Sequence, residues 1–156
     1  GIIIGLASRA PVTVFDEPYL GLDATARQAF YDVLLADYTQ HPRTILLSTH
    51  LIDEMESLLE RVIVLDQGRV VLDATAEEVT GAYCQLSGLA AAVEQVAEGH
   101  QVLRRHAVGG LLSVVIAAPL SVELAQQARS AGVEANAATL QQIVAVLGAS
   151  DQDIAA

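Results

Sequence analysis

Two short apolar runs, residues 12–15 and 44–48, with one helical segment between them, constrain the fold of this chain most strongly. Both runs are continuously apolar or β-branched, which is typical of strands buried on both faces of a sheet. Between them Asp23 is a good N-cap, and it precedes a set of residues at helical spacing: Ala26, Phe30, Val33, Leu34 and Tyr38. The strand–helix–strand order predicts a parallel sheet covered by helices, an α/β fold.

The neighbouring segments extend this α/β region to about residue 80. Residues 1–10 look like the end of a helix. Another helix is predicted from Leu51 onwards, with one apolar face made of Leu51, Met55, Leu58, Leu59 and Val62. Residues 61–66 and 69–72 are two predicted strands joined by a Gly-containing turn, and we expect them to close the sheet. A short capped helix is predicted to follow them.

A composition shift follows Gly81, and the sequence predicts a second, small domain over residues 82–148. Its segments alternate in the order βαββαβα, with strands at 83–86, 101–106, 111–117 and 133–136 and helices at 89–98, 121–131 and 140–147. This order suggests a split-βαβ, ferredoxin-like α+β domain. The polar tail, residues 149–156, is expected to be frayed.

The charge of the chain argues against two classes of partner. The formal net charge is −11, and all eight basic residues are Arg, with no Lys in the chain. Binding to nucleic acid and docking on anionic lipid both draw much of their affinity from clustered basic side chains. We therefore expect no nucleic-acid partner and no direct docking on lipid.

No segment of the sequence predicts a membrane span. The longest uncharged stretch near the middle, residues 106–122, contains two Gly residues and a Pro, and we interpret it as two buried strands and a turn. Residues 1–8 lack the charged region and cleavage site of a signal peptide. Cys84 is the single cysteine, so it cannot form an intramolecular disulfide, which favours a reducing compartment.

Three polar side chains follow the two predicted strands. Asp16 and Glu17 come at the carboxyl end of the first strand, and His50 comes just past the second. Ligands of open α/β sheets bind outside the carboxyl ends of the strands, where these groups would meet if the strands are parallel. Phosphoryl transfer needs a carboxylate for hydrated Mg²⁺, a group that orients the attacking water, and charge stabilisation at the terminal phosphate. The combination predicts a Mg²⁺–phosphate site at this edge.

Taken together, residues 1–80 resemble part of the ATP-binding subunits of ABC transporters. Phe15-Asp16-Glu17-Pro18 resembles the Walker B motif with its adjoining catalytic glutamate. Leu20-Gly21-Leu22-Asp23 resembles the D-loop, and Ser48-Thr49-His50 resembles the switch segment, or H-loop. Residues 1–11 are similar to the helix that follows the signature motif of the family, and residues 60–71 to its closing strands. The departures are small, with Tyr19 standing where the D-loop commonly begins with other residues.

This resemblance implies a partial P-loop NTPase fold of the ABC type, ATP and Mg²⁺ as cofactors, and a role for each polar residue. Asp16 would hold Mg²⁺ through water, and Glu17 would be the general base or water-orienting group. His50 would contact the γ-phosphate, and Asp23 would cross the interface with a second ATP-binding subunit. The family also implies a transmembrane permease as partner and a cytoplasmic location, peripheral on the inner face of the cell membrane.

The phosphate-binding loop of that family is absent from the sequence. No Gly-x-x-x-x-Gly-Lys-Ser/Thr motif occurs, and none can occur in a chain without Lys. The signature and the Q-loop are absent as well. We therefore interpret residues 1–80 as the carboxy-terminal half of an ABC ATP-binding domain, and we expect this chain alone neither to bind ATP tightly nor to hydrolyse it. Residues 82–148 loosely resemble the carboxy-terminal extension of ABC-2-type exporter subunits, on Leu86-Ser87-Gly88-Leu89 and residues 139–143.

Three alternatives stay open. A soluble ABC-type ATPase of DNA repair or translation fits poorly, because basic segments and an inserted coiled coil are lacking. The distal domain could instead be a non-enzymatic regulatory, ligand-binding or dimerisation module, which a pocket with convergent polar groups would favour. The sequence offers few polar residues there beyond Arg104, Arg105 and His106. The third alternative is an inactive truncated product.

Overall fold

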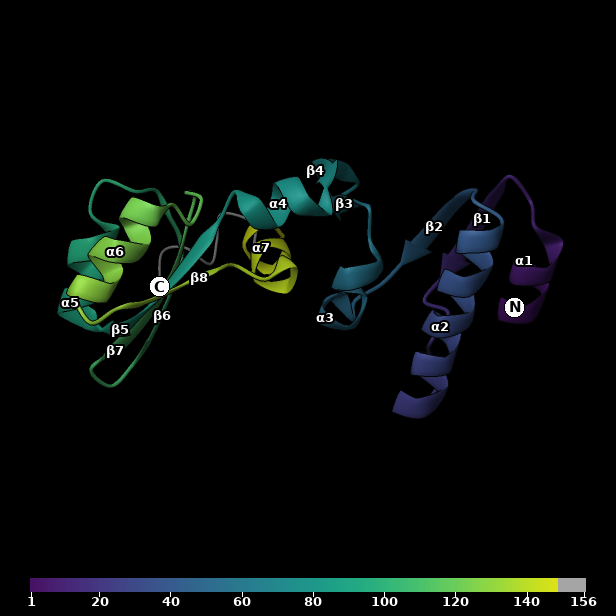
Figure 1. The fold of residues 1–156 in the computed structure, drawn as a ribbon, viewed down its shortest axis with the longest axis horizontal. Coiled ribbons are helices and arrows are strands. Elements are labelled where there is room, and N and C mark those ends of the chain that lie inside the picture. The colour runs from purple at the N-terminus through teal and green to yellow at the C-terminus, as the bar shows by residue number, and fades with distance from the viewer. Residues whose placement is uncertain (149–156) are drawn as a thin grey trace. The chain divides into compact units, whose positions relative to one another are not determined.

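The computed structural model describes residues 1–148, and these residues divide into two compact units at the boundary between Ile52 and Asp53. The predicted tail, residues 149–156, lies outside the described residues. The fold is mixed α/β, with one parallel and two antiparallel sheets among residues 1–148, as the sequence predicted for the class. Figure 1 shows the elements of each unit.

The first unit is a strand–helix–strand unit preceded by a short helix. Its elements are α1 (Ile2–Ser8), β1 (Val12–Asp16), α2 (Ala24–Gln40) and β2 (Thr44–Ser48). The two strands pair in parallel, in a register that sets Asp16 opposite Ser48. The predicted parallel pair is therefore confirmed, and the carboxyl ends of both strands meet at one edge.

One face of this parallel pair is packed and the other is not. Phe15 is buried, its ring meets the ring of Phe30 on α2 edge-on at 5.9 Å, and Gly5 of α1 lies against the same ring. The opposite side chains, Val12, Val14 and Leu46, are 48–66% exposed. The expected cover of helices is thus present on one face only, because the α1 and α2 contacts both fall on the Phe15 side. On α2 the buried side chains are Phe30, Tyr31 and Leu34, while Val33, which shares their helical spacing, is 54% exposed.

An ionic cluster lies near the end of α2. The guanidinium of Arg43 is 2.7 Å from the carboxylate of Asp37, and Arg9 and His41 each lie 3.7 Å from it. The hydrogen bond from Arg43, together with the charges of Arg43, Arg9 and His41, holds the pKa of Asp37 below its ordinary value. The Arg43 side chain is only 5% exposed, so removing Asp37 would leave a buried positive charge without its nearest partner.

We expect Asp37→Asn to lower the denaturation midpoint near neutral pH. A lowered folded-state pKa contributes stability that is complete above the unfolded-state pKa, about 4, and is lost as the pH falls through the folded-state value. The variant should therefore lose stability at pH 7 and lose less than the parent on acidification below about pH 4. Urea denaturation across pH 2–7 measures both, and Asp32→Asn, on the exposed side of the same helix, is the control. Parallel pH profiles for parent and Asp37→Asn would contradict the prediction.

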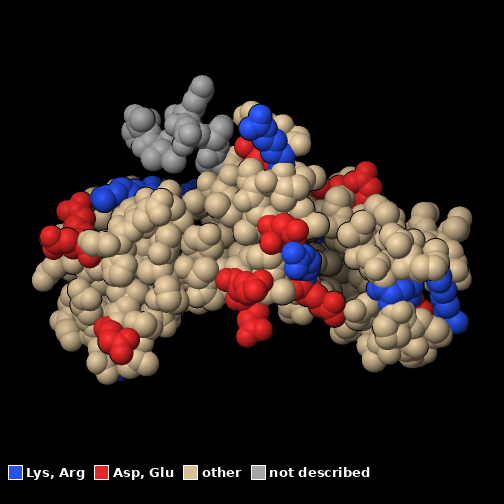
Figure 2. All heavy atoms as spheres, turned by 90° about the horizontal axis from the view of Figure 1, so that it is seen from above, with Lys and Arg blue, Asp and Glu red and all other residues tan. Residues whose placement is uncertain are grey.

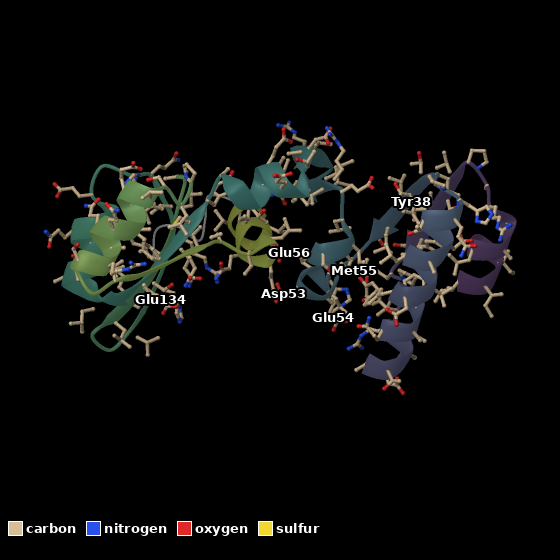
Figure 3. The ribbon with its side chains drawn as sticks, viewed as in Figure 1. Tyr38, Asp53, Glu54, Met55, Glu56 and Glu134 are labelled. Atoms are coloured by element: carbon tan, nitrogen blue, oxygen red, sulfur yellow. The ribbon has the colours of Figure 1, made fainter. Side chains whose placement is uncertain are left out.

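The second unit begins with a short helix and a hairpin. They comprise α3 (Ile52–Met55, its first residue belonging to the first unit), the 3₁₀ turn η1 (Glu56–Leu58), β3 (Arg61–Asp66), β4 (Arg69–Thr75) and the capped helix α4 (Ala76–Gly81). Asp53, Glu54 and Glu56 project from α3 and η1 (Figure 3). Gln67 and Gly68 both have positive φ, as a type I′ hairpin turn requires.

Two predictions fail in this hairpin region. The α-helix expected from Leu51 onwards ends at Met55 and gives way to a 3₁₀ turn, and the strand predicted at residues 61–66 is confirmed as β3, whose backbone is engaged in the ladder with β4. The strands β3 and β4 do not close the parallel sheet but form a separate two-stranded antiparallel sheet. A two-residue turn makes their local pairing the least costly arrangement in chain entropy.

The remaining elements form a four-stranded antiparallel sheet with helices. They are β5 (Cys84–Leu89), α5 (Ala90–Ala97), β6 (Val102–Val108), β7 (Leu111–Ile116), α6 (Val122–Ser130), β8 (Glu134–Ala137) and α7 (Leu140–Leu147). The strand order is β6-β7-β5-β8. The predicted element order is confirmed. Residues 106–122 do contain two strand segments and a turn, but only β7 is largely buried, because the β6 residues from Arg104 to Val108 are exposed. The ferredoxin-like assignment and the domain boundary at residue 81 stay predictions.

The core of this sheet lies between one face and two helices. Cys84, Leu86 and Val114 point from the strands into it, and α5 and α6 supply Val93, Val96, Ala97, Leu124 and Ala128. Burial raises the pKa of the Cys84 thiol, which serves as a small apolar side chain here. The helix α7 instead packs against α4. Along residues 1–148, the helices are too short or too polar to cross a bilayer.

Candidate functional site

A chain of hydrogen bonds ties the two strand ends of the first unit together. The hydroxyl of Ser48 donates to Oδ1 of Asp16 at 2.6 Å and accepts from the backbone N–H of Glu17 at 2.9 Å. This arrangement follows from the parallel register, which sets Asp16 directly opposite Ser48. One serine therefore fixes both the carboxylate of Asp16 and the backbone from which Glu17 projects.

Glu17 has an unusual backbone conformation. Its φ is +42°, in the left-handed region that residues other than Gly rarely adopt. The strand ends at Asp16, and the chain turns at once, with the N–H of Leu20 donating to the carbonyl of Glu17 at 3.1 Å. Strained residues of this kind are concentrated at functional sites, where the surrounding contacts hold them in place. Here the bond from Glu17 to Ser48 is such a contact.

The carboxylate of Glu17 meets the ring of His50. Nδ1 of His50 lies 2.9 Å from both carboxylate oxygens, and the side chains of His50 and Glu17 are 62% and 26% exposed. The hydroxyl of Tyr19 and the ring of His50 hold the pKa of Glu17 below its ordinary value. Glu17 is therefore an ionised acceptor at neutral pH. Asp16, Glu17 and His50 thus lie together at the carboxyl edge of the two strands, as the sequence predicted.

The buried side chain of Tyr19 holds the backbone of His50 in place. Its side chain is only 2% exposed, and its hydroxyl accepts the backbone N–H of His50 at 3.1 Å. The two rings meet at a steep angle with centroids 6.0 Å apart, and burial raises the pKa of the Tyr19 hydroxyl. Sequence reasoning missed the positioning contacts of Tyr19 and Ser48. The signal for Ser48 was its place at the end of the second strand, level with Asp16.

We expect Tyr19→Phe to raise the pKa of the Glu17 carboxyl toward its ordinary value. The substitution keeps the buried ring but removes the hydroxyl, which contributes most to lowering that pKa. Carbon-13 NMR titration of the side-chain carboxyl groups measures the change. Tyr83→Phe, in the other unit, should leave the titration of Glu17 unaltered. An unshifted Glu17 in Tyr19→Phe would show that His50 alone controls this carboxylate.

Asp23 takes no part in the hydrogen bonds that connect Asp16, Glu17 and His50. It is the N-cap of α2, and its carboxylate accepts the backbone N–H of Ala26 at 2.8 Å. That role agrees with the capping expected from the sequence. The contacts of Asp23 do not connect it to Glu17 or His50, and its role at a subunit interface stays a prediction.

The donor set suits one kind of metal ion. Within residues 1–148, no three His, Cys, Asp or Glu side chains converge as a ready-made metal site. Mg²⁺ does not require such a cage, because it keeps several waters and is bound by one or two carboxylates together with substrate phosphates. Asp16 offers one carboxylate, fixed by Ser48 and exposed at the strand edge. It therefore fits a Mg²⁺ ion held through water.

Comparison with known proteins gives relatives for about half of the chain. It is 36% identical over 78 residues to the doxorubicin resistance ATP-binding protein DrrA of Mycobacterium tuberculosis, covering 50% of this chain and 23% of that protein. It is 36% identical over 74 residues to the energy-coupling factor transporter ATP-binding protein EcfA2 of Enterococcus faecalis, covering 47% and 26%. The aliphatic sulfonates import ATP-binding protein SsuB of Shigella flexneri is 33% identical over 72 residues, covering 46% and 28%.

These relatives are ATP-binding proteins of ABC transporters, so over about half its length the chain is homologous to such proteins. The resemblance expected from the motifs is thereby confirmed for the ATP-binding part. The match spans about a quarter of the length of each relative. No protein-family model matches the chain.

Proposed function

We propose that this chain is part of an ATP-hydrolysing, energy-coupling subunit of an ABC-type transporter, and that Asp16, Glu17 and His50 are its hydrolysis residues. The observation that carries the proposal is the network at the shared carboxyl edge of two parallel strands, in which Ser48 bonds the carboxylate of Asp16 and the backbone N–H of Glu17, and the carboxylate of Glu17 meets His50. Homology to ABC ATP-binding proteins over half the chain supports the same reading.

Each side chain has a chemical task in this proposal. Asp16 holds Mg²⁺ through water, and the ion with the phosphates of ATP would supply the charge neutralisation that phosphoryl transfer needs. Glu17 is an ionised carboxylate whose two oxygens both lie near Nδ1 of His50. In this proposal it orients the attacking water or accepts its proton. His50 is exposed beside it and is the group that would contact the terminal phosphate.

We further propose that this chain alone is inactive. It contains no Lys and no glycine-rich phosphate loop, so nothing in its sequence supplies the usual cradle for the β- and γ-phosphates. The bare face of the parallel pair supports the same proposal, because Val12, Val14 and Leu46 occupy positions that an α/β sheet normally covers. A larger ATP-binding domain would cover that face and bring the phosphate loop to the strand edge.

The partners follow from the family. A second ATP-binding subunit would face Asp23, and a transmembrane permease would receive the energy of hydrolysis. The subunit would then work in the cytoplasm, peripheral on the inner face of the cell membrane. Binding of nucleic acid is not expected, and on the face shown in Figure 2 the Arg side chains of either unit are scattered and form no stripe. The distal sheet domain would be an extension like that of ABC-2-type exporter subunits.

Hydrolysis of MgATP, measured on two samples, tests the proposal. The first sample is the chain by itself, and the second is the chain extended by the codons that precede it in its gene. We expect turnover in the extended polypeptide and none in the chain alone. A saturable, low-micromolar MgATP isotherm for the chain alone would overturn the proposed inactivity. If an extended polypeptide carrying a phosphate loop and signature shows no turnover, the ATPase proposal fails.

A further inference from the structure

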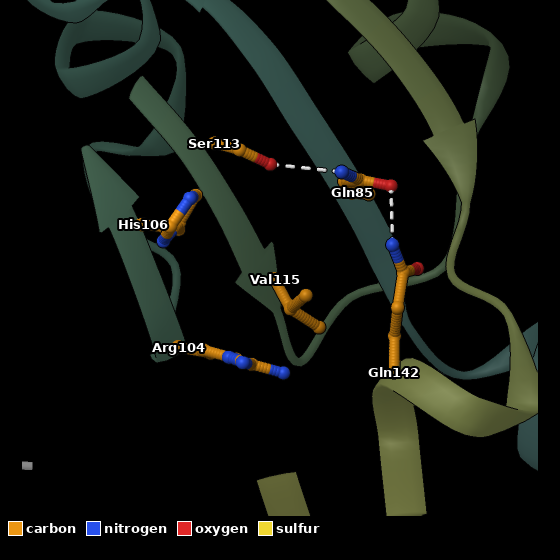
Figure 4. A pocket seen from close by; sticks show the side chains of 6 residues that line it. All are labelled: Gln85, Arg104, His106, Ser113, Val115 and Gln142. Atoms are coloured by element: carbon orange, nitrogen blue, oxygen red, sulfur yellow. Dashed lines mark hydrogen bonds between the residues drawn. The ribbon is translucent and has the colours of Figure 1, made fainter. Parts of the chain in front are cut away.

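The face of the distal sheet opposite its core contains a hollow of about 230 Å³. On β5 and β7, side chains alternate between the two faces, so residues next to the core positions Leu86 and Val114 point to the other side. Figure 4 shows the six residues that line the hollow, which are Gln85, Arg104, His106, Ser113, Val115 and Gln142. Five of the six are polar and Val115 is apolar, so polar groups from three strands and one helix converge there.

Hydrogen bonds fix part of this lining. Nε2 of Gln85 donates to the hydroxyl oxygen of Ser113 at 2.8 Å, and Nε2 of Gln142 donates to Oε1 of Gln85 at 2.7 Å. The N-cap of α7 holds Gln142 in turn, because the N–H of Thr139 donates to its side-chain oxygen at 3.0 Å. The hydroxyl of Ser113 accepts from Gln85, so its own proton can be donated into the hollow.

Arg104 brings a charge that the described residues leave unbalanced. No side-chain hydrogen bond or ion pair engages it within residues 1–148, and no carboxylate is among the six lining residues. In Figure 4 its side chain extends from β6 toward Gln142. The adjacent Arg105 differs, because it points to the other face and lies 3.6 Å from Glu94 of α5. Among the described residues, the polar lining therefore holds an Arg and no carboxylate, which favours negative charge in the hollow.

We propose that this hollow binds a small oxyanion, a phosphate or a carboxylate, through Arg104, His106 and Ser113. Arg presents paired N–H donors that match two oxygens of such an anion, and the hydroxyl and the imidazole add further donors. The volume is below the range of pockets that enclose drug-sized ligands, which favours a compact anion. The proposal does not depend on the ATPase proposal, because its residues belong to the distal sheet. It makes this domain a binding module for a small anionic ligand.

Titration of the full chain by proton–nitrogen NMR tests the site. Inorganic phosphate and malonate are added separately at constant ionic strength, with chloride as the balancing anion. We expect saturable shifts at the amides of Arg104, His106, Ser113 and Gln142. Arg104→Gln should weaken binding about tenfold or more, because it removes a charge-assisted donor pair. Arg105→Gln changes the same charge on the same strand but on the other face, and it should weaken binding less than about twofold.

The two anions identify the class of ligand. Tighter binding of phosphate supports a phosphate-bearing ligand, and tighter binding of malonate supports a carboxylate. Shifts that grow linearly with both anions, or equal weakening by the two Arg variants, would overturn the proposal, because general charge attraction would then explain the response. The wild-type titration decides the matter even if Arg104→Gln fails to fold, which its own spectrum reports. ATP turnover enters none of these readouts.

Discussion

Replacing Glu17 with Gln in the extended polypeptide should reduce MgATP hydrolysis by about 10²–10⁴-fold while leaving MgATP binding nearly intact. Gln has almost the same size and can still accept a hydrogen bond from the ring of His50 or the hydroxyl of Tyr19. It lacks the negative charge with which Glu17 polarises a water or takes its proton. The phosphates are held by other groups, so affinity for the nucleotide should change little.

Two further variants serve as a control and as a test of the proposed Mg²⁺ residue. Glu77→Gln alters an exposed glutamate in the first turn of α4, and it should leave turnover unchanged. Asp16→Asn should instead raise the Mg²⁺ concentration needed for turnover, because the proposed role of Asp16 is to hold the ion. Steady-state phosphate release and equilibrium binding of MgATP measure these effects. Full turnover by Glu17→Gln would remove Glu17 from the mechanism and leave His50 as the candidate.

The strand ends could be predicted because their determinants are local in the sequence. Continuous apolar runs followed by polar residues locate Asp16, Glu17 and His50, and parallel pairing brings such ends together whatever the rest of the chain does. The supporting contacts could not be predicted in this way. The positive φ of Glu17 and the path of the Tyr19 hydroxyl to the backbone of His50 depend on the turn that follows the strand. No periodic pattern encodes that turn.

The helix expected from Leu51 onwards shows how a periodic pattern can mislead. Apolar residues at helical spacing ran on into Val62, which is buried in the structure but as part of a strand. Val62 pairs with Ala74 across the hairpin, and that ladder satisfies its backbone groups as well as a helix would. Val33 lies in the apolar set of α2 at helical spacing, yet its side chain is exposed. Helical spacing identifies an apolar stripe, but packing against Phe15 selects which part of the stripe is buried.

The sequence did not predict the polar hollow on the distal sheet. It only indicated that a pocket with convergent polar groups there would favour a ligand-binding module. Arg104 and His106 stood out in the sequence as polar residues of that domain, but their spacing did not show which face they share. The shared face depends on the pairing of β6 with β7, which includes a register shift between Val102 and Arg104. Because one slip of register exchanges the two faces of a strand, Arg105 rather than Arg104 would otherwise have faced the hollow.

Leu86→Ala should destabilise the distal domain by about 2–5 kcal/mol. Leu86 is fully buried on the central strand β5, in a core to which two strands and two helices contribute. Truncation removes apolar contacts and leaves a cavity that rigid neighbours cannot fill. Leu89→Ala is the matched control, since Leu89 belongs to the same strand but is 67% exposed, and its effect should stay within about 0.5 kcal/mol.

Urea denaturation followed by the NMR signals of residues 84–147 measures this difference, which suits a chain without Trp. The loss is large for a domain of this size, because small domains bury a modest fraction of their surface and are marginally stable. We therefore expect Leu86→Ala to unfold a measurable fraction of the domain in water and to weaken any binding of anions at Arg104 in proportion to the unfolded fraction. Equal midpoints for the two Leu variants would mean that the Leu86 core contributes little. The hollow at Arg104 could then not depend on that core for its shape.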